Sequence, residues 1–212
     1  AWRIIFGEGG GNLRCAVAAR AGVERDLFPQ PVHYGDGSNH TMRFAGGVLE
    51  VNGRTLLVTS VHLKCCGRMG DESDFRRRVE AARLRAIIDE HVASGRVDGV
   101  VIGGDFNLVG GFAPMAIAKA GLDMDGSDLA IADVLQFDRR TNATWEDPGQ
   151  PFIPGRLDYL LYSDASLRMA RGFVLDTRDI APRWLQEHGL NEMSTAEASD
   201  HLPIVVDLVW EK

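Results

Sequence analysis

Long apolar stretches are absent from the 212-residue sequence, and no run approaches the roughly 20 apolar residues that span a bilayer. The opening residues Ala1–Phe6 are too short for a secretory signal and have no small-residue cleavage site. We therefore expect no transmembrane or targeting segment in these residues. The sequence indicates neither a compartment nor an oligomeric state.

Cysteine is scarce, and the sequence contains only Cys15, Cys65 and Cys66. Three cysteines cannot form the paired framework of a small disulfide-stabilised protein, and a bond between neighbours strains the peptide that joins them. Cys65 and Cys66 also lack the spaced second pair and the histidines of a structural zinc site. We expect reduced, partly buried thiols.

Positive charge is also in short supply, with 23 Lys and Arg against 30 Asp and Glu and a formal net charge of −7. Proteins that bind long duplex DNA usually present a basic face, because counterion release drives that binding. The acidic balance disfavours such a partner, although a local patch can oppose the net charge. It suits a site that gathers carboxylates around a hard cation. The serine-nucleophile pattern G-x-S-x-G is missing, which disfavours hydrolysis of amides.

What the sequence does contain is the pattern of one layered α+β domain over residues 1–212. No internal repeat or low-complexity linker divides it. The expected strands are residues 1–6, 15–19, 48–51, 56–62, 97–102, 156–162, 172–175 and 204–210. Asn52-Gly53 predicts a tight hairpin turn, because both residues tolerate positive φ.

A long helix is expected from about Ser73 to Ser94, with Ser73 as N-cap and Gly95 as the left-handed stop. Helical spacing predicts one stripe against the sheet, made of Phe75, Val79, Ala82, Ala86 and Ile87. The expected solvated face carries Arg76, Arg77, Arg78, Arg83 and Arg85. A shorter helix is expected to begin near Pro114 and to end near Gly121.

Four short segments place acidic, amide or imidazole groups at strand ends, where scaffolded sites usually lie. They are Ser60-Val61-His62-Leu63, Gly104-Asp105-Phe106-Asn107, Gly155-Arg156-Leu157-Asp158-Tyr159 and Ser199-Asp200-His201-Leu202-Pro203. Each alone is weak evidence, because such residues commonly form turns. Together, in this order, they resemble the endonuclease/exonuclease/phosphatase family. The resemblance covers residues from about Phe44 to Val209, and more loosely Ala1 to Arg20.

The resemblance implies a four-layer α/β/β/α sandwich of the deoxyribonuclease I type and a phosphoesterase that depends on Mg²⁺ or Mn²⁺. Such hydrolysis needs an activated water, a cation and donors for the phosphoryl oxygens. By the same resemblance the catalytic residues are His62, Asp105, Asn107, Asp158 and His201, and the metal ligands are Asp200 and Asp105.

The resemblance also implies a role for each catalytic group. Asp158 would orient His201, which serves as general base or as donor to the phosphate. Asp105 would orient or deprotonate the attacking water, and which of Asp105 and His201 takes the proton stays open. Asn107 and His62 would bind phosphoryl oxygens of the substrate.

Two parts of the family pattern do not appear: an early strand that ends in Asn, and a second that ends in Gln-Glu, whose Glu is the principal metal ligand. Glu8 lies in a Gly-rich turn and is expected to be solvated. We therefore expect a domain that lacks its N-terminal part. An alternative is a weakly active or inactive member that acts as a binding or scaffolding module.

The substrate class is only loosely indicated. Trp145 and Arg156 can flank the site and stack on, or pair with, a leaving group. A packed tryptophan and a strand-end ion pair explain the two residues equally well. The acidic balance favours a small phosphoester, a lipid headgroup or a nucleotide over long duplex DNA.

Overall fold

The computed structural model describes residues 1–28, 31–34, 37 and 39–211. In chain order the strands are β1 Trp2–Phe6, β2 Ala16–Arg20, β3 Glu24–Phe28, β4 Val32–His33, β5 Thr41–Val51, β6 Arg54–His62, β7 Gly99–Asp105, β8 Ala130–Ile131, β9 Asp158–Tyr162, β10 Leu167–Val174 and β11 Ile204–Trp210. The helices are α1 Glu72–Ala93, α2 Ala113–Lys119, the 3₁₀ turn η1 Thr177–Asp179, α3 Pro182–Glu187 and α4 Ser194–Ala198. Of these described helices, none is long and apolar enough to cross a membrane.

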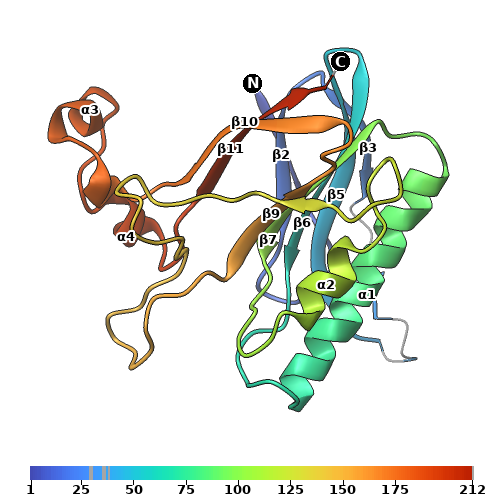
Figure 1. The fold of residues 1–212 in the computed structure, drawn as a ribbon, viewed down its shortest axis with the longest axis horizontal. Helices are drawn as coiled ribbons and strands as arrows, with labels where there is room; N and C mark the ends of the chain where they lie inside the picture. Colours follow the sequence, from blue (N-terminus) through green and yellow to red (C-terminus); the bar gives the residue numbers. More distant parts are fainter. Residues whose placement is uncertain (29–30, 35–36, 38, 212) are drawn as a thin grey trace.

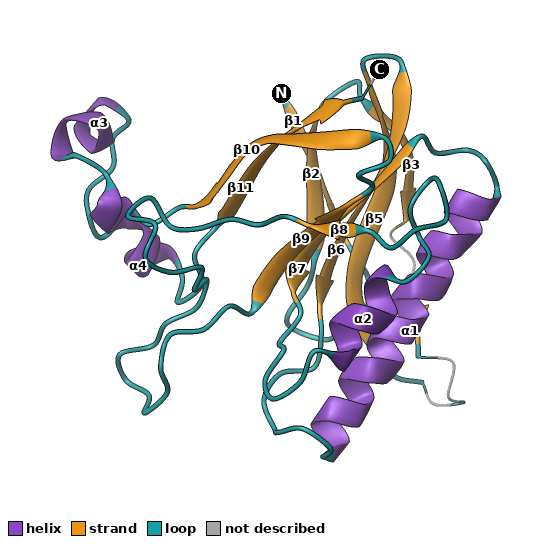
Figure 2. Ribbon diagram, viewed as in Figure 1, coloured by secondary structure: helices purple, strands orange, loops and turns teal. Residues whose placement is uncertain are grey.

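A seven-stranded sheet lies at the centre of the molecule (Figures 1 and 2). Its strand order is β3-β5-β6-β7-β9-β8, with β4 paired to β5. β6 and β7 run parallel, and the other neighbouring pairs run antiparallel. Parallel neighbours need a crossover connection, which α1 supplies between β6 and β7. The expected turn joins β5 to β6, with positive φ at Asn52 (55°) and Gly53 (78°).

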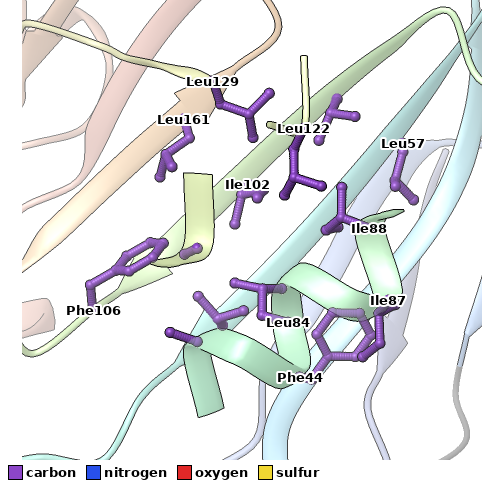
Figure 3. Packing of buried hydrophobic residues seen from close by; sticks show 14 of the residues in the cluster. Phe44, Leu57, Leu84, Ile87, Ile88, Ile102, Phe106, Leu122, Leu129 and Leu161 are labelled. Carbon is purple, nitrogen blue, oxygen red and sulfur yellow. The ribbon is translucent and has the colours of Figure 1, made fainter. Parts of the chain in front are cut away.

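α1 and α2 cover one face of this sheet (Figure 1). Figure 3 shows Leu84, Ile87 and Ile88 of α1 packed toward Leu57 and Ile102 of the sheet. Burying each such side chain contributes roughly 1.5–3 kcal/mol. This cluster is the main core, and it fixes the ends of β6 and β7 relative to the helix.

The opposite face of the sheet meets two separate antiparallel pairs, β1–β2 and β10–β11. Strand alternation shows the two faces clearly, because Leu161 of β9 lies in the helix-side core while Leu160 and Tyr162 pack with the β10–β11 cluster. On the same side, Val17 of β2 packs with Ala45 of β5. α3 and α4 lie at the end remote from α1 (Figure 1). The α+β layering expected from the sequence is confirmed.

Two expectations about α1 are wrong. Its N-cap is Asp71, whose side chain accepts a hydrogen bond from the Asp74 N–H, so Ser73 lies inside the first turn. Phe75 is 68% exposed, and Ala82 and Ala86 are exposed as well. The buried face is Asp74, Arg77, Glu80, Ala81, Leu84, Ile87 and Ile88. Ile87 is buried and Val79 packs against the core, as expected. Arg77, expected on the solvated face, is instead buried, because Asp74 and Arg77 form hydrogen bonds to loop residues that hydrophobic spacing does not predict.

The three cysteines are free, as expected. Cys15 is buried, Cys65 is half-buried and Cys66 is exposed. Burial raises the pKa of the Cys15 thiol to about 11, which keeps it protonated at neutral pH.

Candidate active site

Three of the predicted catalytic residues form one row across the central sheet. The strand register pairs His62 with Asp105, and Asp105 with Asp158. Paired residues on neighbouring strands project to the same face, about 4.8 Å apart along the hydrogen-bonding direction. β6 and β7 end at this edge and β9 begins there, so residues more than forty positions apart in sequence lie next to one another.

Gly104 allows this row to form. It has φ of 145°, and a Cβ at this position would lie 1.9 Å from the Val61 carbonyl oxygen. Only glycine tolerates such a close approach of two backbones. The close packing of β7 against β6 therefore requires glycine at position 104, directly before Asp105.

Asp158 and His201 form a hydrogen-bonded pair, with His201 Nδ1 2.8 Å from Asp158 Oδ2. The same carboxylate oxygen accepts a bond of 2.8 Å from the Thr144 hydroxyl, which in turn accepts from the Asp158 N–H at 2.9 Å. Thr144 is fully buried, and the residue after it, Trp145, forms a backbone bridge with His201. Thr144 thus holds the acid of the pair, a role that no sequence pattern had indicated.

Asn107 holds Asp105 in place. Its backbone N–H donates to Asp105 Oδ1 at 2.8 Å, and its side-chain Nδ2 donates to Asp105 Oδ2 at 2.7 Å and to the Leu63 carbonyl at 3.0 Å. The residue has φ of 47°, which aims both groups back at the strand end. Both amide hydrogens therefore have acceptors inside the protein.

The charges at the row follow from burial and from close neighbours. Burial, with added repulsion from Asp158, raises the pKa of Asp105 to about 7. Burial and the positive charge of Arg43 lower the pKa of His62 to about 4, so this imidazole is neutral at pH 7. The contact of 3.5 Å between His62 Nε2 and Asp105 Oδ2 is therefore not an ion pair. The hydrogen bond that His201 donates to Asp158 raises the pKa of His201.

A groove of about 310 Å³ opens beside Asp158 and His201, with Gly103 and Gly104 of β7 in its wall. No atom lies within 4 Å of the position of a Cβ on Gly103. The groove therefore reaches His201 and the end of β7.

Arg77 is a further residue of the site that sequence reasoning missed. It is fully buried, and its guanidinium donates to the carbonyls of Lys64 (3.0 Å), Cys66 (2.6 Å) and Val109 (3.2 Å). These carbonyls belong to the loops that follow His62 and Asn107. Arg77 therefore joins the loop that follows His62 to the loop that follows Asn107. An arginine within a run of three arginines gave no sign of burial.

The remaining predicted residues lie around this row. Asp200 is exposed, and its Oδ2 accepts a bond of 3.0 Å from the half-buried Trp145 indole. Arg156 donates to the Ala132 carbonyl at 2.7 Å and stacks 4.5 Å above the Tyr159 ring. The Arg156 guanidinium is thus engaged by Ala132 and Tyr159, which lie outside the row His62–Asp105–Asp158.

The donor set suits a hydrated cation better than a closed protein cage. Among the described residues, no group of three or more His, Cys, Asp or Glu side chains converges on a metal position. Burial is the main cause of the raised pKa of Asp105, and repulsion from Asp158 adds to it, so a cation beside the two carboxylates would favour their charged forms. Mg²⁺ commonly uses one or two carboxylates and completes its shell with water and substrate phosphate. Asp105 and Asp200 are the carboxylates predicted for this role, and both lie near enough to His201 to raise its pKa.

An α+β sandwich with carboxylates and histidines at one sheet edge defines a class, the deoxyribonuclease I-like proteins. The model of the Endonuclease/Exonuclease/phosphatase family matches residues 2–201, and the chain belongs to this family. Membership indicates a phosphoester hydrolase of the nuclease or phosphatase type. No curated protein sequence matches the chain.

Solved structures share the fold at low sequence identity. The human nocturnin catalytic domain with a bound sulfate anion is 18% identical, with a TM-score of 0.61 over 99% of this chain and 72% of that one. D. rerio TDP2 with a single-strand DNA product is 12% identical, with a TM-score of 0.60 over 98% and 77%. A mannosyl-6-phosphatase from Bacteroides thetaiotaomicron is 16% identical, with a TM-score of 0.58 over 98% and 77%. Identities this low establish the fold alone.

Proposed function

We propose that this single domain is a divalent-cation-dependent phosphoesterase that hydrolyses a phosphodiester or phosphomonoester with water. The observation that carries the proposal is the row His62–Asp105–Asp158, with His201 hydrogen-bonded to its last member. A scaffold has no need of the Asp158–His201 pair or of the Gly104-Asp105-Phe106-Asn107 segment.

Asp105 and His201 are assigned complementary proton roles by their environments. Asp105, whose pKa is about 7 in the cation-free protein, lies at the strand end where it would orient or deprotonate the attacking water. The hydrogen bond to Asp158 raises the pKa of His201, which favours a role as donor to the phosphoryl oxygens or to the leaving group. Of the two candidates that the sequence left open, we propose Asp105 as the proton acceptor.

The other residues bind and orient the substrate. Neutral His62 offers an imidazole beside Asp105. Asn107 orients Asp105 and would contact a phosphoryl oxygen after releasing one of its two internal acceptors. Mg²⁺ or Mn²⁺, held by Asp105 and Asp200, would supply charge neutralisation for the phosphoryl group. Trp145 and Arg156 are proposed to lie toward the leaving group.

The substrate is proposed to be a small phosphoester, a lipid headgroup or a nucleotide. The fold is shared by a protein solved with a single-strand DNA product and by one named as a sugar phosphatase, so it accommodates both ester types. The net charge of −7 supports the smaller substrates over long duplex DNA.

Hydrolysis of bis-p-nitrophenyl phosphate tests the proposal directly. We expect turnover with Mg²⁺ or Mn²⁺ that EDTA abolishes, and a loss in kcat of at least about 100-fold for Asp105→Asn and for His201→Gln. Asp89→Asn and His188→Gln, which change exposed residues of the same types, serve as matched controls. Turnover that survives both active-site substitutions would refute the assignment.

One observation favours a second function, a binding or scaffolding module: no third acidic or imidazole ligand joins Asp105 and Asp200 among the described residues. Calorimetric titration with Mg²⁺ separates the two functions. The enzyme is expected to bind Mg²⁺ at millimolar concentration or below, and Asp200→Ala is expected to remove this binding. Absence of any cation binding would favour the module.

A further inference from the structure

A second cavity, of about 320 Å³, adjoins the catalytic row on the side of His62 that faces away from Asp105. The Gly10-Gly11 turn, β5 and the first turns of α1 enclose it, and we call it the anion pocket. Arg43 of β5 is the register partner of His62, so it continues the row His62–Asp105–Asp158 by one more strand.

The walls of the anion pocket carry three cationic side chains, Arg43, Lys64 and Arg76, and one carboxylate, Glu80. Glu80 is committed to the wall, because it accepts from the Tyr34 hydroxyl at 2.6 Å and from the Lys64 N–H at 2.6 Å. Formal charges leave an excess of positive charge here in a chain whose net charge is −7.

Arg43 and Lys64 supply this excess. Arg76 lies 3.8 Å from Glu80 and also donates to the Tyr34 hydroxyl, so it is bound into the wall. The stem of Arg43 packs under Gly10, where a Cβ would lie 2.3 Å from Arg43 Cγ. This glycine leaves room for the arginine to lie along the pocket beside His62.

We propose that the anion pocket binds a second phosphate group of the substrate, one nucleotide unit away from the ester that is hydrolysed at Asp105. The inference rests on the proposed function and narrows its substrate class to nucleotide chains with an adjoining phosphate. Two strand spacings, about 10 Å, separate the Arg43 and Asp105 positions, a span that one nucleotide and an arginine side chain bridge. A guanidinium binds phosphate through paired hydrogen bonds, and an ammonium adds a point charge.

The test compares the thymidine dinucleotide TpT with its 5′-phosphorylated form pTpT, by calorimetric binding in EDTA so that turnover does not consume the ligands. We expect pTpT to bind at least tenfold more tightly than TpT. Arg43→Ala is expected to reduce this preference to less than twofold. Arg25→Ala, which removes an exposed arginine paired with Glu50 on the same sheet, is expected to keep it.

Lys64→Met, which keeps the aliphatic stem, provides a second variant in case Arg43→Ala does not fold. Equal affinities for the two dinucleotides, no binding of either, or a preference that survives both substitutions would overturn the inference. Hydrolysis of bis-p-nitrophenyl phosphate tests the proposed function separately. This ester has a single phosphate and leaves the anion pocket empty, so its turnover does not depend on the pocket.

Discussion

At the scale of single residues, the raised pKa of Asp105 makes the stability of the protein depend on pH. Its carboxyl group is largely buried, with Asp158 as its strand partner, and these surroundings favour the protonated form. The unfolded chain would release this proton near pH 3.8, whereas the folded protein holds it until about pH 7. Between these values unfolding releases a proton, so the free energy of unfolding falls as the pH rises.

Replacing Asp105 by Asn should remove this pH dependence. In EDTA, the free energy of unfolding of Asp105→Asn minus that of the unchanged protein is expected to rise by at least about 1 kcal/mol between pH 4 and pH 8. Urea unfolding at the two pH values measures it. Comparing the two differences cancels any constant loss from altered hydrogen bonds to Asn107. A difference that stays flat across this range would mean that Asp105 ionises normally.

At the scale of secondary-structure elements, α1 organises the site as well as the core. Its later turns bury Leu84, Ile87 and Ile88 against the sheet, while Arg77 in its second turn reaches the loops after β6 and β7. The helix that makes the parallel crossover thus also ties together the strand ends that it connects. The loops that follow His62 and Asn107 are therefore held in position by the same arginine, Arg77.

Arg77→Met keeps the stem but removes the donors to three buried carbonyls and leaves Asp74 with one charge partner fewer. We expect a loss of about 3 kcal/mol in the free energy of unfolding, because buried charge partners become unpaired. Arg77→Lys should recover part of it. Arg85→Met, at an exposed arginine of the same helix, should cost less than about 1 kcal/mol, and urea unfolding compares the variants. Equal losses for Arg77→Met and Arg85→Met would contradict the view that Arg77 stabilises the fold by joining these two loops.

Sequence predicted the elements better than it predicted their faces. Asn52-Gly53 identified the β5–β6 turn, because positive φ at two successive residues has few other uses. α1 was expected at nearly its observed length, yet its buried side was only partly right. Ile87 is buried as expected, but Arg77 and Glu80 are buried through hydrogen bonds to loops. Such partners come from distant segments, and hydrophobic periodicity carries no information about them.

At the scale of the whole molecule, the order of the motifs predicted which residues belong together, and the strand register shows how they meet. The row His62–Asp105–Asp158 depends on β6, β7 and β9 being neighbours, which no local pattern specifies. The contacts of Thr144 and Arg77 and the anion pocket form only when the chain folds, because each brings together segments far apart in the sequence. The distribution of charge also emerges only from the whole fold, because the protein is acidic overall and yet forms one pocket with an excess of positive charge.

The central claim is that the chain's widely separated motifs act as one catalytic unit, and a double-mutant cycle of Asp105 and His201 tests it most directly. The measurement is kcat for bis-p-nitrophenyl phosphate in Asp105→Asn, His201→Gln and the double variant. If the residues act together, the double variant should lose no more than about tenfold beyond the worse single variant. A double variant whose loss equals the product of the two single losses would contradict the claim.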